Sequence, residues 1–85
     1  MGELYVHPHT LKHGLSEQDV RHAWRNAVAS VVRVCDDGRE DVLAIGPDTH
    51  GRIVEMVAAR DGVDMLVFHA MTPPTRRFRR EMGIA

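Results

Sequence analysis

Four arginines lie within five residues near the C-terminal end of the chain, at Arg76, Arg77, Arg79 and Arg80. A hydrophobic run that ends in His69, followed by a Thr-Pro-Pro turn, comes directly before them. Arginine keeps its charge at any working pH and binds phosphate through two parallel N–H groups. The cluster therefore indicates a phosphate ligand, usually a nucleic acid. The alternative is a solvated helix end that only keeps the chain soluble.

Glu55 and His69 form a second group with acid–base chemistry, on two neighbouring strands of an expected hairpin. A three-residue loop at 60–62 pairs Met56 with Leu66 and Val54 with Phe68. One face is then apolar, and Glu55 and His69 project together from the other. A two-residue turn at 61–62 would instead push Glu55 into the core, so we prefer the first register. The pair is then a histidine oriented by a carboxylate, able to move protons near neutral pH, or else two surface groups without a task.

A helix and several strands are needed to position these side chains. Ser16 is a good N-cap with Asp19 at the capping-box position, and an amphipathic helix follows, with apolar residues at Val20, Ala23, Trp24, Ala27 and Val28. Alternating apolar runs bounded by turn residues predict strands at 4–6, 31–35, 41–45, 52–59 and 64–71. Thr72 as N-cap and Pro73 at the first helical position predict a short C-terminal helix.

The fold class expected from this order is α+β. Residues 1–85 should form a single domain, an antiparallel four-stranded meander with the N-terminal helix or helices on one face and a short C-terminal helix. No apolar run is long enough to span a membrane, and the N-terminus lacks the pattern of a signal peptide. The single cysteine cannot form an internal disulfide, which indicates the cytoplasm.

Charge is unevenly distributed although the net charge is −1. Residues 1–51 carry five Lys or Arg against eight Asp or Glu, whereas residues 52–85 carry six Arg against four acids. A locally basic face on a mildly acidic body is suited to one anionic partner and one basic partner.

Several short motifs, in order along most of the chain, resemble the BrnT-type toxins of the RelE/ParE superfamily, which belong to bacterial type II toxin–antitoxin systems. Residues 12–16, Lys-His-Gly-Leu-Ser, are similar to the segment that starts the helix in that family. Residues 43–46 and 51–57 are similar to its second and third strands, and residues 69–71 with the arginine-rich segment to its fourth strand and C-terminal helix.

The resemblance implies a RelE-like fold and a ribonuclease, that is, a hydrolase that cuts messenger RNA without a cofactor or a metal ion. It also implies a cognate antitoxin, a small dimeric DNA-binding protein, as partner, and an RNA substrate that is free or on the ribosome. Only Lys12 and His13 carry over by motif. From the expected geometry we add Glu55 and His69 as catalytic residues, and as phosphate-binding residues Arg52, Arg76, Arg79 and Arg80. Met71 stands where the family has an arginine, and His69 where it has a serine.

Two other functions remain open. The chain could be a non-catalytic interaction module, in which the arginine helix binds an acidic antitoxin or another partner. Alternatively, His7, His9 and His13 could supply three nitrogens to a zinc ion, although Pro8 and the missing fourth ligand make this the weakest of the three hypotheses.

Overall fold

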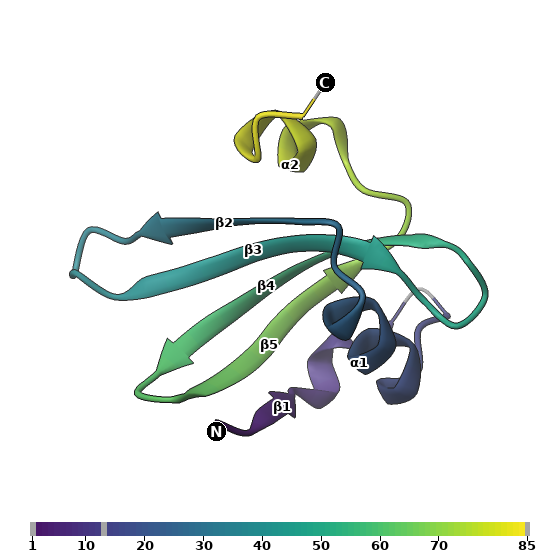
Figure 1. The fold of residues 1–85 in the computed structure, drawn as a ribbon, viewed down its shortest axis with the longest axis horizontal. Coiled ribbons are helices and arrows are strands. Elements are labelled where there is room, and N and C mark those ends of the chain that lie inside the picture. Colours follow the sequence, from purple (N-terminus) through teal and green to yellow (C-terminus); the bar gives the residue numbers. More distant parts are fainter. Residues whose placement is uncertain (1, 13, 85) are drawn as a thin grey trace.

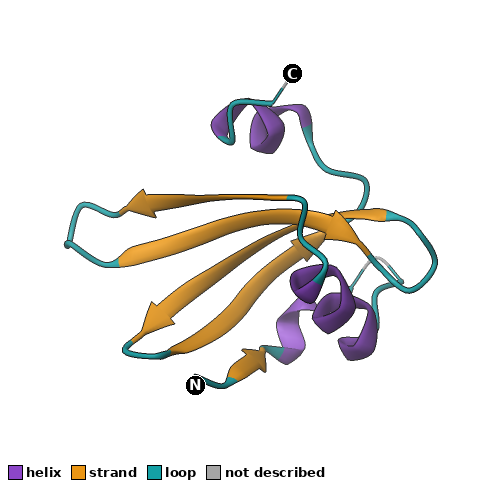
Figure 2. Cartoon of the chain, in the orientation of Figure 1, coloured by secondary structure: helices purple, strands orange, loops and turns teal. Residues whose placement is uncertain are grey.

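The computed structural model describes residues 2–12 and 14–84. Its elements are, in chain order, β1 (Leu4–Val6), the 3-10 turn η1 (Pro8–Thr10), α1 (Glu17–Arg25), β2 (Ala29–Val34), β3 (Glu40–Pro47), β4 (Ile53–Asp61), β5 (Asp64–Met71) and α2 (Arg76–Glu81). The strands form one sheet, and α1 and α2 lie against different parts of it (Figures 1 and 2). The expected α+β class is confirmed. None of the described helices is long and apolar enough to cross a membrane.

The sheet has five strands and is mixed, so the prediction of a four-stranded antiparallel sheet is wrong. The strand order is β1-β5-β4-β3-β2. Strands β2 to β5 do form the expected antiparallel meander, but β1 adds to its edge, parallel to β5, with Leu4 opposite Met65. This pairing matters for function because it brings the segment after β1, namely η1, against the second half of β5.

Helix α1 begins where the sequence predicts. The Ser16 hydroxyl accepts a hydrogen bond from the Asp19 N–H, and the Asp19 carboxylate accepts one from the Ser16 N–H, which completes a capping box. The helix ends earlier than the apolar spacing indicated, at Arg25. Val28 therefore lies outside it, 75% exposed, and does not belong to its buried face.

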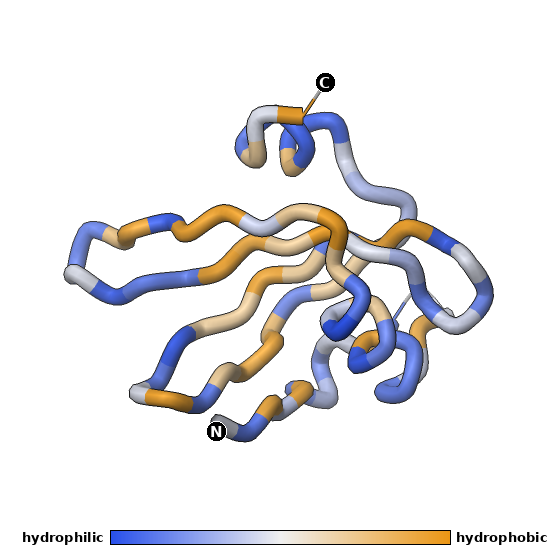
Figure 3. Tube along the Cα trace, viewed as in Figure 1, coloured by the Kyte–Doolittle hydropathy of each residue, from blue (hydrophilic) through white to orange (hydrophobic). Residues whose placement is uncertain are grey.

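The two faces of the sheet carry separate apolar clusters. On one face, Val20 and Ala23 of α1 pack on the central strands, with Trp24 partly buried beside them. On the other, Phe78 and Met82 of the C-terminal segment pack on Leu43, Ile45 and Val57. Strand residues alternate between these clusters, as the pleat requires. Figure 3 shows hydrophobic residues along the middle of the strands and hydrophilic ones at the β2–β3 turn and along much of α1, whereas the β4–β5 turn includes a hydrophobic segment.

The C-terminal helix begins later than predicted. Its N-cap is Thr75, whose hydroxyl accepts the Phe78 N–H. Thr72, the predicted cap, instead donates its hydroxyl to the Ile53 carbonyl and ties the end of β5 to the start of β4. Either threonine could serve as a helix N-cap. Because Thr72 binds the Ile53 carbonyl, it lies in the linker before the helix, and Thr75 is the cap.

The β4–β5 register differs from both expected alternatives. The turn is Gly62-Val63, with Asp61 opposite Asp64 and Ala58 opposite Val67. A bulge follows, since the next pair is Val57 with His69, and Phe68 has no partner on β4. The predicted pairs of Met56 with Leu66 and Val54 with Phe68 are therefore wrong, and Phe68 is 36% exposed instead of buried in the core.

Candidate functional site

Glu55 and His69 meet on the face of the sheet that α2 covers. Glu55 lies in β4, 3% exposed, and its Oε2 is 2.8 Å from Nε2 of His69 in β5. Its other oxygen, Oε1, accepts the Thr75 N–H at 2.6 Å. The predicted meeting of the two side chains is thus confirmed, although the register that predicted it is wrong.

The hydrogen bond to Glu55 sets what His69 can do. With the carboxylate ionised, Nε2 donates its proton to Glu55, so the neutral imidazole keeps Nδ1 as a proton acceptor. Within residues 2–12 and 14–84 no hydrogen bond to Nδ1 is present, and the side chain is 42% exposed. The pair is therefore an imidazole held through Nε2, with Nδ1 not engaged and the side chain partly exposed.

His69 lines two cavities. The first, the arginine cavity, measures about 190 Å³ and is lined by Arg33, Glu55, Val57, His69, Thr75, Arg77, Phe78 and Glu81. The second, the lysine cavity, measures about 170 Å³ and is lined by His9, Lys12, Phe68, His69 and Ala70. Each of the two cavities that His69 lines therefore also has a cationic residue in its lining, and positive charge stabilises a phosphate with increasing negative charge.

Two arginines lie beside the pair: Arg33, which was not predicted, and Arg77, a member of the C-terminal arginine cluster that was not among the predicted phosphate-binding residues. Arg33 of β2 is held by Asp41 at 3.2 Å and by Glu81 at 2.9 Å. The hydrogen bonds that the guanidinium donates to Glu81 and Asp41 raise the pKa of Arg33, which therefore stays charged. Arg77 of α2 makes no ion pair within the part of the chain that the structure describes. A signal for Arg33 existed, because it is a charged residue at a position where the alternation of β2 calls for an inward apolar side chain.

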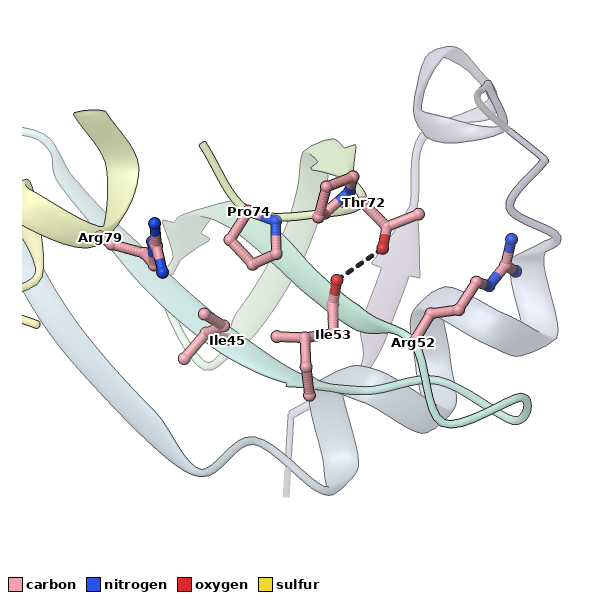
Figure 4. A pocket seen from close by; sticks show the side chains of 7 residues that line it. Ile45, Arg52, Ile53, Thr72, Pro74 and Arg79 are labelled. Atoms are coloured by element: carbon pink, nitrogen blue, oxygen red, sulfur yellow. Dashed lines mark hydrogen bonds between the residues drawn. The ribbon is translucent and has the colours of Figure 1, made fainter. Parts of the chain in front are cut away.

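The predicted phosphate-binding arginines lie elsewhere. The four predicted residues were Arg52, Arg76, Arg79 and Arg80. None of them lines either of the cavities that His69 lines. Arg52 and Arg79 instead line a larger cavity of about 670 Å³, together with Ile45, Ile53, Thr72, Pro73 and Pro74. In this proline cavity Arg79 comes from α2, and Arg52 extends away from the isoleucines (Figure 4).

Of the two residues carried over by motif, Lys12 is placed beside His69 in the lysine cavity. His13 lies outside the described residues. His9, which sequence analysis considered only as a metal ligand, also lines the lysine cavity. The Nδ1 atom of His7 accepts the His9 N–H at 3.0 Å, so this nitrogen caps η1.

A second polar cluster surrounds Arg52. Its Nε is 2.7 Å from Asp48, and its guanidinium also reaches Asp19 at 3.4 Å. The pKa of Asp19 is lowered mainly by a hydrogen bond from the Thr49 hydroxyl, and next by one from the Ser16 N–H. Burial alone would raise the pKa of Asp48, but hydrogen bonds from His50 and Arg52 outweigh it and lower that pKa.

Asp19, Asp48 and His50 are also spaced closely enough to hold a metal ion, with ligand atoms within 4.8 Å of one another. Both carboxylates, however, already bind Arg52, which supplies the positive charge that a metal ion would bring. The cluster is accordingly a structural one that holds the β3–β4 loop against the start of α1.

Comparisons with protein-family models, with curated proteins and with solved structures gave no match.

Proposed function

We propose that this chain is a metal-independent endoribonuclease, the toxin of a bacterial type II toxin–antitoxin system. The observation that carries the proposal is the Glu55–His69 pair, a partly exposed imidazole fixed by a buried carboxylate between two cation-lined cavities. The resemblance of the sequence to BrnT-type toxins points in the same direction. It also supplies the expected partner, a small dimeric DNA-binding antitoxin.

RNA cleavage requires little more than proton transfer and charge stabilisation. Nδ1 of His69 removes the proton of a ribose 2′-hydroxyl, and the 2′-oxygen then attacks the adjacent phosphorus. The bond to the 5′-oxygen breaks, which leaves a 2′,3′-cyclic phosphate on one fragment and a 5′-hydroxyl on the other. Lys12 or His9, across the lysine cavity, supplies the proton for the leaving oxygen.

Arg77 stabilises the extra negative charge on the phosphorane from the arginine cavity, and Arg33 adds to the local positive potential. Glu55 is a positioning residue in this mechanism. Both of its oxygens are occupied, by His69 and by the Thr75 N–H, so it holds the imidazole in place.

The test compares the parent with His69→Ala and Arg77→Ala, in growth of an expressing bacterial host and in cleavage of single-stranded RNA with a chelator present. RNA is offered both free and on ribosomes. The parent should arrest growth and cleave, and His69→Ala should be about 10²- to 10⁴-fold slower because it lacks the base. His50→Ala and Arg60→Ala are matched controls outside both cavities, and they should behave like the parent. Cleavage by His69→Ala at the parent rate would contradict the proposal.

A second function, a non-catalytic module that binds an acidic partner, is favoured by one specific observation. The proline cavity combines the apolar side chains of Ile45 and Ile53 with the guanidinium of Arg79 (Figure 4). An acidic segment with an apolar anchor would fit this combination. On this hypothesis Arg79→Ala weakens capture of the antitoxin, whereas His69→Ala changes neither capture nor growth.

A further inference from the structure

Phe68 occupies an unusual position for a large aromatic residue in the middle of a strand. Two nearby apolar residues of β5 are deeply buried, Val67 at 0% and Ala70 at 5% exposure, whereas Phe68 is 36% exposed. The cause is the bulge, which leaves Phe68 without a partner on β4, between the pairs formed by Val67 and by His69. Bulges often occur beside active sites, where they redirect a side chain.

The side chain is redirected towards a polar environment. Phe68 lines the lysine cavity together with Lys12, His9 and His69. Neither Lys12 nor the His9 ring forms an ion pair within residues 2–12 and 14–84, so both are available to a ligand. The cavity therefore combines an aromatic ring, an ammonium group and two imidazoles.

Each of these groups matches one part of a nucleotide. Any base can stack on a phenylalanine ring, because every base has a π face, and single-stranded nucleic acids are usually bound in this way. The ammonium group of Lys12 suits a backbone phosphate. An acidic peptide would use the lysine but would not use an exposed aromatic ring adjacent to the general base.

We propose that Phe68 is the stacking platform for the base next to the phosphate that is cleaved, with Lys12 binding the backbone beside it. The ligand is single-stranded nucleic acid, bound with little base preference because stacking does not read the hydrogen-bonding edges of the base. This inference rests on the proposed ribonuclease function and extends it by a binding subsite.

Single-stranded DNA separates binding from catalysis, because it has bases and phosphates but no 2′-hydroxyl. Affinity for a labelled DNA oligonucleotide is measured by fluorescence anisotropy with the parent, Phe68→Leu and Phe68→Tyr. Phe68→Leu should bind roughly 5- to 150-fold more weakly, the range of one base–aromatic stack. Phe68→Tyr should keep the parent affinity because the ring is retained.

Equal binding by Phe68→Leu and the parent, or equal losses in both variants with the fold intact by circular dichroism, would overturn the inference. So would the absence of DNA binding by the parent. RNA cleavage is scored separately. If DNA binding depends on the ring but the parent does not cleave RNA, the platform stands and the ribonuclease proposal fails. If the parent cleaves RNA but Phe68→Leu binds DNA as the parent does, the ribonuclease proposal stands and the stacking platform fails.

Discussion

At the scale of single residues, Glu55 has the clearest assignment. It is a buried carboxylate on an apolar face, and it is tolerated there because His69 and the Thr75 N–H satisfy both of its oxygens. In the proposed mechanism it acts through the imidazole, because both of its oxygens are already occupied. It should therefore affect the rate of cleavage more than the binding of the substrate.

Glu55→Gln tests this role. The amide would present an N–H to His69, so Nε2 would become the acceptor and the proton would move to Nδ1, the atom that must act as base. We expect single-turnover cleavage to slow by about 10²- to 10⁴-fold, the usual contribution of a general base, with little change in DNA affinity. A variant that unfolds at the parent temperature, cleaves at the parent rate and keeps the parent pH–rate profile would refute the role.

The meeting of Glu55 with His69 was predictable, but its register was not. In the expected register Glu55 lies opposite Val67, two residues before His69. In the observed register it lies opposite Met71, two residues after His69, so the two side chains are diagonal neighbours in both. Alternation of apolar residues fixes which face a side chain occupies, and it gives no information on a bulge. The exposure of Phe68 depends on that bulge, so the sequence could not reveal it.

At the scale of elements, α2 depends on the sheet for its stability. It has six residues, which is too few for a helix to be stable by itself. Phe78 and Met82 pack on the sheet, and Glu81 is paired with Arg33. The Glu81–Arg33 pair is well exposed and should contribute only about 0–1 kcal/mol. Packing of Phe78 is therefore the main attachment of the helix that carries Arg77.

Phe78→Ala should lower the free energy of unfolding by about 3–5 kcal/mol, since it removes a side chain that is 6% exposed. Chemical denaturation followed by circular dichroism measures the loss. Ile84→Ala is the matched control in the same segment, and as Ile84 is 37% exposed its effect should be much smaller. Similar losses in the two variants would mean that α2 is not anchored by Phe78.

Local signals predicted the elements whose boundaries depend on local contacts. The capping box at Ser16 fixes the start of α1, and turn residues bound the strands of the meander. Two of the errors involve distant partners. Leu4–Val6 is too short for its own pattern to reveal its pairing with β5, and Thr72 is drawn into the linker by Ile53.

At the scale of the whole molecule, stability should depend on acid pH through Asp19 and Asp48. Both have folded-state pKa values below the ordinary value of 3.8, because hydrogen bonds favour the charged form of each carboxylate and Arg52 also favours that of Asp48. Their contribution to stability is therefore complete above about pH 5 and is lost as the pH falls through about 4 towards the folded pKa values.

Urea denaturation at pH 7, 5, 4 and 3 measures this dependence. The parent should lose stability mainly below pH 5, and Asp48→Asn should be less stable at pH 7 with a flatter profile. Asp36→Asn, a change at the exposed β2–β3 turn, should leave the profile unchanged. An unchanged slope in Asp48→Asn would show that other groups control the acid dependence.

The parallel pairing of β1 with β5 has a consequence for synthesis of the protein. Lys12 is translated well before Thr75, whose N–H binds Glu55, and before Arg77, whose side chain lines the arginine cavity. A nascent chain therefore cannot assemble the site until the residues beyond Thr75 have left the ribosome. On the proposed function, the ribosome that makes this protein would be protected from it until α2 has emerged, and in that interval an antitoxin already in the cell could reach the chain.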